Sequence, residues 1–212
     1  MSRIRPLDQG TRIPGRGRCY LYVFPCGWED LCKLGISRDP LDRLQALHPR
    51  WFEFFDLEHG MLVELDRVRE ARDLELALGH ALAEHNAVAP LTVRVAAGGH
   101  TEWYRGASSR LASELDALRE RGHLLHALRP WLRATLAARS DRLYAWTQAS
   151  LDVDALESSS CALPAHRAVR DALDAHRPLD LDVAPWVPDA VLGWYRRVSD
   201  AGPAAPGERG GG

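Results

Sequence analysis

The sequence predicts an α+β fold, a small, mainly antiparallel sheet flanked by helices and followed by a helical C-terminal region. Residues 20–24 and 31–36 alternate their side chains with the period of a β-strand, and Gly27 with two acidic residues lies between them as a hairpin connection. Leucines then recur at helical spacing through much of residues 107–200. The strands therefore belong to the first half of the chain and the helices dominate the second.

A helix is predicted directly after the second strand. Asp39 supplies an N-cap and Pro40 a first-turn proline, which together start a helix. Its buried side is formed by leucines at helical spacing, and Arg43 lies off that side, close to the end of the strand 31–36. A tyrosine, a glycine turn and an arginine are thereby expected on one surface.

The next segments are expected to extend the sheet and to cover it. The aromatic run 51–55 and residues 61–65, separated by a turn at 58–60, are strand candidates, of which one or both join the hairpin. Residues 66–84 form the best-supported helix, with Glu75 at the shoulder of its apolar face. That position suits a carboxylate facing a cleft, and it equally suits an ordinary glutamate at the boundary of a buried face.

The remaining elements follow from turn and cap signals. Residues 91–95 are predicted to be extended, Gly98-Gly99 to turn, and residues 101–104 to return as a strand or an ordered loop. Ser108 or Ser109 is expected to cap the next helix, which carries leucines through 136 and breaks near Gly122 or Pro130. Shorter helices are expected over residues 142–149, over residues 165–176 and after residue 186.

Four regions are predicted from these elements. They are a flexible basic arm (1–18), a sheet-containing domain (19–106), a helical region (107–200) and a disordered tail (201–212).

The charge of the chain is balanced overall and unevenly distributed. The 212 residues include 46% hydrophobic and 26% charged residues, with a net charge of −2, which counts against a protein that coats DNA non-specifically. Residues 1–18 hold five arginines and one aspartate, a net of +4, whereas residues 19–106 hold nine basic and fourteen acidic residues, a net of −5. The arm either contacts phosphates where the domain cannot, or is a solvated leader.

The cysteines and the hydropathy point to a cytoplasmic protein without a membrane partner. The four cysteines form no CxxC pair and have no paired histidines, so a zinc site is not expected and reduced thiols are. No signal peptide is recognisable, and no apolar run approaches the ~20 residues that a membrane span needs.

Five stretches follow one another along residues 19–106: YLY (20–22), KLGIS (33–37), PLDRLQAL (40–47), the helix that carries Glu75, and TEWY (101–104). In this order they resemble the GIY-YIG endonuclease domain, in particular the phage-type subgroup whose second signature is K-I-G and whose closing motif is TEWF. The resemblance covers residues 19–106. It implies a DNA endonuclease that uses one divalent cation, Mg²⁺ or Mn²⁺.

The resemblance also implies roles for individual residues. Tyr22 would activate the attacking water, Arg43 would clamp the scissile phosphate, and Glu75 would be the metal ligand. Gly35 would leave room for the substrate. The plainer alternatives are a sheet aromatic for Tyr22, an ion pair with Asp39 or Asp42 for Arg43, and simple turn geometry for Gly35.

Three more residues are candidates for substrate binding. Tyr20 shares the face of Tyr22 and either stacks on a base or packs in the core, whereas Ser37 either donates to a phosphate or caps the next helix. Lys33 stands where many members of the family have tyrosine, and is expected to donate to a phosphate or to lower the pKa of a nearby tyrosine. Leu47 stands where many members have histidine or tyrosine, and their late asparagine has no counterpart here.

Three functions are consistent with these features. The first is a metal-dependent DNA endonuclease with a helical half for positioning or oligomerisation. The second is a catalytically inactive module that holds DNA or RNA through Arg43, Lys33 and the basic arm. The third is a protein-interaction factor whose function lies in the helical half.

Overall fold

The computed structural model describes residues 18–151 and 163–200, which form two compact units. The first unit runs to Thr135 and the second begins at Leu136. The predicted tail, and the predicted arm except for Arg18, lie outside the described residues. Each unit has its own apolar core.

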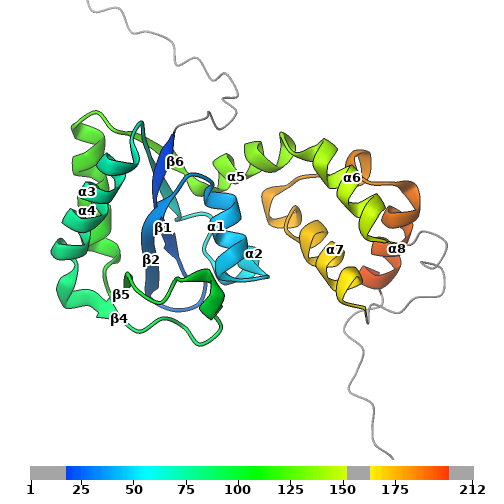
Figure 1. Ribbon diagram of the computed structural model, residues 1–212, viewed down its shortest axis with the longest axis horizontal. Coiled ribbons are helices and arrows are strands. Elements are labelled where there is room, and N and C mark those ends of the chain that lie inside the picture. The colour runs from blue at the N-terminus through cyan, green and yellow to red at the C-terminus, as the bar shows by residue number, and fades with distance from the viewer. Residues whose placement is uncertain (1–17, 152–162, 201–212) are drawn as a thin grey trace, which may run out of the picture. The chain divides into compact units, whose positions relative to one another are not determined.

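A six-stranded antiparallel sheet forms the centre of the first unit (Figure 1), as the sequence predicts. Its spatial order is β4-β5-β2-β1-β3-β6. The strands are β1 (Cys19–Pro25), β2 (Leu31–Ser37), β3 (Met61–Leu65), β4 (Asn86–Ala87), β5 (Trp103–Arg105) and β6 (Leu124–Ala127).

The predicted hairpin of β1 and β2 is confirmed, and its register fixes which side chains share a face. Tyr22 pairs with Gly35 and Phe24 with Lys33. Because side chains directly opposite each other point to the same face of a sheet, these four residues share one face. Leu21, Val23 and Leu34 point to the other face.

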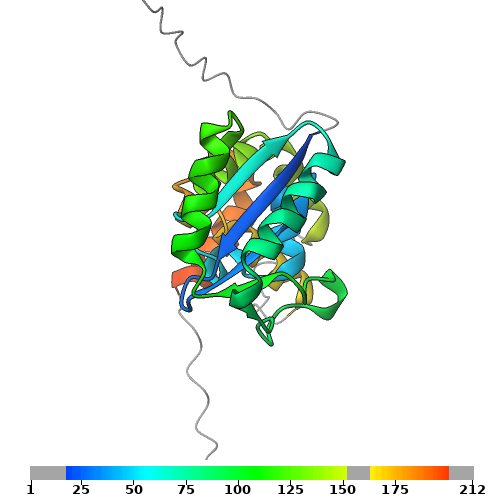
Figure 2. The same ribbon diagram turned by 90° about the vertical axis from the view of Figure 1, so that its left-hand side faces the viewer.

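Helices cover both faces of the sheet (Figures 1 and 2). On one side lie α3 (Val68–Ala81) and α4 (Ser108–Glu120), whose apolar residues form the main core with Leu21, Val23 and Leu34. On the other side lie α1 (Pro40–Leu47) and α2 (Trp51–Phe54). The Asp39 carboxylate caps α1 by accepting from the backbone N–H groups of Leu41 and Asp42, as predicted.

One strand candidate, residues 51–55, and one segment predicted to be extended, residues 91–95, adopt other conformations. Residues 51–55 form the short helix α2, in which Phe54 N–H donates to Arg50 C=O and Phe55 N–H to Trp51 C=O. A strand would place Glu53 on the same face as two aromatic rings, whereas the helical turn exposes Glu53 alone and buries the four aromatic residues around it. Residues 91–95 form a turn that enters the 3₁₀ segment Val95–Ala97, because Val93 N–H bonds Pro90 C=O within the turn.

One predicted helical stretch is a strand. Gly122 has φ +90°, and the backbone N–H groups of Gly122 and His123 donate to the C=O groups of Arg119 and Leu118. This arrangement is a Schellman cap, which ends α4 at Gly122 as predicted and reverses the chain. Residues 124–127 then pair with β3 as β6 instead of continuing the helix. The first unit thus extends past the predicted boundary at residue 106, and the region 107–200 is not wholly helical.

Helices make up the second unit, as the sequence predicts. Helix α5 (Leu128–Ala137) crosses the division between the units, and α6 (Ser140–Ser150), α7 (Pro164–Asp174) and α8 (Asp189–Asp200) follow. Short 3₁₀ segments occur at Ala83–His85, Arg177–Leu179 and Ala184–Trp186. The core of the unit gathers around Val169, Leu173 and Trp194. Among the described helices of either unit, none has the length and apolar character of a membrane span.

Cys19, Cys26 and Cys32 carry free, buried thiols, and Cys161 lies outside the described residues. Burial raises the pKa of the Cys26 and Cys32 thiols to about 12. Both side chains lie in the first unit, close to the turn between β1 and β2.

We expect stability to fall as the pH rises above 9. In the unfolded chain these thiols ionise near 9, so above that pH the unfolded state binds fewer protons than the folded state, and unfolding becomes easier. Each thiol contributes about 1 kcal/mol of this loss between pH 7.5 and 10. Urea unfolding at the two pH values measures it. In Cys32→Ala the difference in the free energy of unfolding between pH 7.5 and pH 10 should shrink by about 1 kcal/mol. An unchanged difference would show that the Cys32 thiol does not cause the loss.

Candidate functional site

The candidate site lies at one edge of strand β2, where the neighbouring strand stops. β5 pairs with β2 only from Leu31 to Lys33, and in the described part of the chain no strand pairs with residues 35–37 on that side. Glu102, just before β5, has φ +54° and turns the chain away, while its C=O accepts from Leu34 N–H. Groups carried by helices on opposite faces can therefore meet around this edge.

Tyr22, Gly35 and Arg43 come together here, as predicted. Arg43 Nε donates to the Tyr22 hydroxyl oxygen over 3.0 Å. The ring of Tyr22 lies over Gly35 so closely that a Cβ at position 35 would be 2.3 Å from that oxygen. The glycine is thus required by the tyrosine ring, since any side chain would occupy the place of the phenol.

The guanidinium of Arg43 is fixed from a second direction by the loop before β5. Its Nη1 donates to the C=O of Ala97 over 2.6 Å, and a Cβ on Gly99 would lie 3.4 Å from its Nη2. The side chain is half-buried. Its contacts run to Tyr22 and this loop, rather than to the aspartates that the alternative interpretation names.

Lys33 differs from its prediction. Its side chain is 1% exposed, and its ammonium donates to the C=O of Leu34 and pairs with the Glu102 carboxylate over 3.2 Å. Burial lowers the pKa of Lys33, an effect that the neighbouring charge of Glu102 opposes. The ammonium is therefore committed to internal partners and does not face an incoming phosphate.

Glu75 belongs to the same electrostatic cluster. The side chain is half-buried on α3. Burial raises the pKa of its carboxyl, the charge of Glu102 raises it further, and the charges of Lys33 and Arg43 lower it. These four side chains therefore form one charged neighbourhood in the electrostatic sense, although among the described residues no hydrogen bond or ion pair joins Glu75 to the other three.

The phenol of Tyr22 is a weaker acid than the sequence predicts. Its side chain is 1% exposed, and burial raises its pKa, while the positive charge and hydrogen bond of Arg43 lower it. The pKa of Tyr22 is thus raised where the sequence predicts a lowered one, and the positive charge that opposes the rise is Arg43, not Lys33. Tyr22 keeps its proton at neutral pH.

Tyr20 and Ser37 follow their plainer alternatives. Tyr20 is 2% exposed and meets the rings of Trp131 and His126 edge to face, with centroids 5.5 and 6.3 Å apart. That burial leaves no ring face for a base. The Ser37 hydroxyl donates to the C=O of Asp39 and accepts from its N–H, so it closes the turn into α1.

A divalent cation would find one suitable carboxylate at this edge. In the described ranges 18–151 and 163–200, no group of three or more His, Cys, Asp or Glu side chains is arranged to hold a metal. Mg²⁺ commonly binds through one or two carboxylates plus water and phosphate oxygens. Glu75 fits that mode, because a cation beside it would offset both its burial and the repulsion from Glu102.

Two features of the site were not predicted from the sequence. One is Glu102 as the partner of Lys33, and the other is the Ala97 carbonyl that holds Arg43. The Gly98-Gly99 pair indicated a turn, and Gly98 does adopt φ +59°. Nothing in the sequence indicated that this turn would fold back onto α1.

Comparison with models of known protein families, with curated proteins and with solved structures finds no match to this chain. The resemblance of the five stretches to the GIY-YIG domain therefore rests on residues of this sequence alone. Within that resemblance, Tyr22, Gly35 and Arg43 are the residues that are in contact at the β2 edge.

We expect Gly35→Ala to destabilise the first unit by about 1–3 kcal/mol, because the new methyl group would overlap the phenol of Tyr22. Urea unfolding measures the change. Gly193→Ala is the matched control: in the middle of α8 the added methyl would lie 3.6 Å from Arg197 Nη1, so that change should be neutral or stabilising. Equal stability of Gly35→Ala and the wild type would show that Tyr22 does not need this glycine.

Proposed function

We propose that the protein is a metal-dependent endonuclease of the GIY-YIG type, which hydrolyses phosphodiester bonds in DNA. The observation that carries this proposal is the hydrogen bond from Arg43 Nε to Tyr22, directly over Gly35 and within the charged neighbourhood of Glu75. Tyr22, Gly35 and Arg43, each in a signature position, are in contact at one sheet edge, and the charge of Glu75, from a fourth signature position, acts on the Tyr22 phenol.

Arg43 is the group that would bind the scissile phosphate. Two of its nitrogens are engaged by Tyr22 and Ala97, and no described residue accepts a hydrogen bond from the third, Nη2. A guanidinium fixed in this way presents its remaining donors without further loss of side-chain freedom. A charge-assisted hydrogen bond from Nη2 would stabilise the negative charge that develops on phosphate oxygens.

Tyr22 would position the attacking water while keeping its proton. Its oxygen accepts from Arg43 Nε, so its own O–H remains a donor or a partner for water. Glu75 would hold the Mg²⁺ or Mn²⁺ ion. When bound, such a cation supplies positive charge that stabilises the leaving oxygen.

A second candidate is a module of the same shape that binds nucleic acid without cleaving it. Burial of the Tyr22 phenol and of the Lys33 ammonium favours it, because neither group is presented at the surface for proton transfer. Arg43 would then serve binding alone. A role of the second unit in oligomerisation or in binding another protein is the third candidate.

We expect Glu75→Ala and Arg43→Ala each to reduce nicking of plasmid DNA at least 100-fold in the presence of Mg²⁺ or Mn²⁺. The first change removes the metal ligand, and the second removes the charge that faces the phosphate. Initial rates of conversion of supercoiled to open-circular plasmid measure the effect, and circular dichroism verifies that each variant is folded.

The controls are changes of the same type at exposed sites. Glu70→Ala lies on the same helix as Glu75, and Arg110→Ala removes an arginine that pairs with Glu114 on α4. Both should nick at the wild-type rate. Gel retardation without cleavage by the wild type would favour the binding module, and neither activity would favour the interaction protein.

A further inference from the structure

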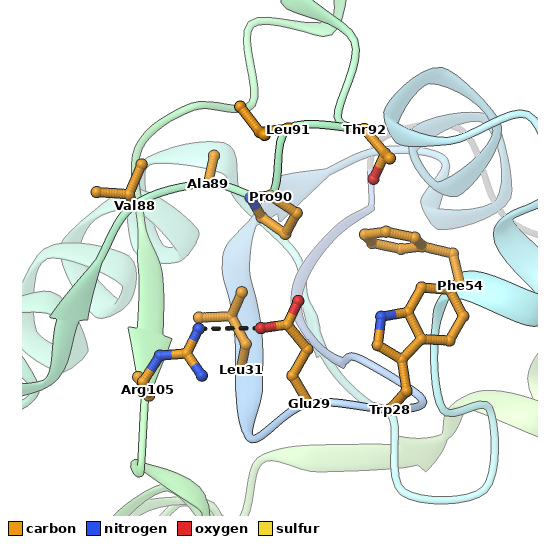
Figure 3. Close-up of a pocket in the computed structure, with 10 residues that line it drawn as sticks. All are labelled: Trp28, Glu29, Leu31, Phe54, Val88, Ala89, Pro90, Leu91, Thr92 and Arg105. Atoms are coloured by element: carbon orange, nitrogen blue, oxygen red, sulfur yellow. Dashed lines mark hydrogen bonds and ion pairs between the residues drawn. The ribbon is translucent and has the colours of Figure 1, made fainter.

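A pocket of about 400 Å³ opens at the far end of β2 from the candidate site (Figure 3). In Figure 3 the turn between β1 and β2, with Trp28 and Glu29, lies below the pocket, Phe54 of α2 lies on the right, and the loop 88–92 runs above it. Leu31 and Arg105, which pair across β2 and β5, form the floor. Its volume lies within the range of sites for small organic ligands, ~300–1,000 Å³.

One wall of the pocket is an exposed aromatic ring. Trp28 is 63% exposed, although tryptophan usually buries most of its surface, and it is held upright by edge-to-face contact with Phe54 at 5.3 Å between centroids. Val88 and Leu91, in the loop 88–92, are also exposed apolar residues, and their side chains point away from the pocket (Figure 3). The indole of Trp28 is therefore the surface on which a flat ring can stack.

The floor carries one carboxylate and one guanidinium side by side. Arg105 Nη2 donates to Glu29 Oε2 over 2.9 Å, and no described residue donates to Oε1. Figure 3 shows the Glu29 carboxylate directed into the middle of the pocket, between Arg105 and the indole. The pocket therefore offers the carboxylate acceptors of Glu29 next to the guanidinium donors of Arg105, beside the indole of Trp28.

We propose that this pocket binds an unpaired guanine base. The Watson–Crick edge of guanine carries two adjacent donors, N1–H and the N2 amine, followed by the acceptor O6. The carboxylate of Glu29 matches the two donors, Arg105 matches O6, and Trp28 supplies the stacking surface.

The other bases fit this floor less well. Adenine and cytosine each bring one amine donor to the carboxylate where guanine brings two, and thymine brings a single N–H flanked by acceptors. A base paired in a duplex has this edge occupied and both faces stacked, so the pocket selects single-stranded or unpaired nucleotides.

The pocket and the candidate site share a strand and a loop. Leu31 and Gly35 are four residues apart on β2, about 13 Å at ~3.3 Å per residue. The loop that lines the pocket with residues 88–92 continues to the Ala97 carbonyl that holds Arg43. Guanine binding goes beyond the proposed cleavage, because it needs neither a metal ion nor turnover, so either proposal can fail without the other.

The test is equilibrium binding of fluorescein-labelled oligonucleotides to the full chain in EDTA, followed by fluorescence anisotropy. A thymidine 12-mer with one central deoxyguanosine should bind about tenfold more tightly than the all-thymidine 12-mer, and inosine, which lacks the N2 amine, should lose much of this gain. Trp28→Ala should weaken binding of the guanine oligonucleotide about tenfold or more, since stacking on an aromatic ring contributes ~1–3 kcal/mol. Glu29→Gln should abolish the preference for guanine over thymine.

Two matched controls should leave the preference intact. Trp146→Ala removes a tryptophan that is 41% exposed in the second unit, and Glu58→Gln breaks an ion pair with Arg129 of similar length, 3.0 Å. Quenching by free GMP of tryptophan fluorescence that is absent in Trp28→Ala, without binding of either oligonucleotide, would assign the guanine to a free nucleotide. Binding of the guanine oligonucleotide that free GMP does not displace would assign it to a strand. Equal, measurable binding of the two 12-mers by the wild type, failure of both the oligonucleotides and GMP to bind, or an unchanged preference in Glu29→Gln would overturn the proposal.

Discussion

The ion pair between the buried Lys33 ammonium and the exposed Glu102 carboxylate is the constraint on which the sheet edge depends. An ammonium that is 1% exposed needs a compensating charge and a hydrogen-bond acceptor, and Glu102 and the Leu34 carbonyl supply them. Holding Glu102 there places its backbone at φ +54°, outside the range of a strand. β5 therefore stops beside Lys33, and the rest of β2 is left without a neighbour on that side. The open edge of β2 beside Tyr22 and Arg43 is thus a consequence of a lysine inside a sheet.

This opening explains how groups from opposite faces share one neighbourhood. Arg43 is carried by α1 and Glu75 by α3, and these helices lie on different sides of the sheet (Figure 1). A continuous sheet would separate them by its own thickness. At the edge of β2 the charges of both act on the same groups, among them the phenol of Tyr22.

The parts of the fold that local signals define could be predicted from the sequence. Residues close together in the chain define the hairpin with its alternating side chains, the Asp39-Pro40 start of α1 and the amphipathic α3. They also place Tyr22 near Arg43. Residues 51–55 and 124–127 could not be predicted, because short apolar runs fit a helix and a strand equally and tertiary contacts decide between them. The burial of Lys33 and Tyr20 could not be predicted either. Whether a side chain on a sheet face is exposed depends on what lies against that face, and Glu102 contacts Lys33 while Trp131 contacts Tyr20.

Strand β6 extends the sheet beyond residues 19–106, the part of the chain that carries the signature motifs. It pairs with β3 through four residues and follows α4, whose Leu111, Leu115 and Leu118 complete the core beneath β1 and β2. A fragment cut after TEWY and the following loop would strip these leucines from the core and leave β3 as a bare edge, where unpaired backbone groups invite association with other chains. The smallest piece of this chain that can stand alone is consequently set by where the hydrophobic interior closes, near Thr135, and not by where the recognisable motifs end.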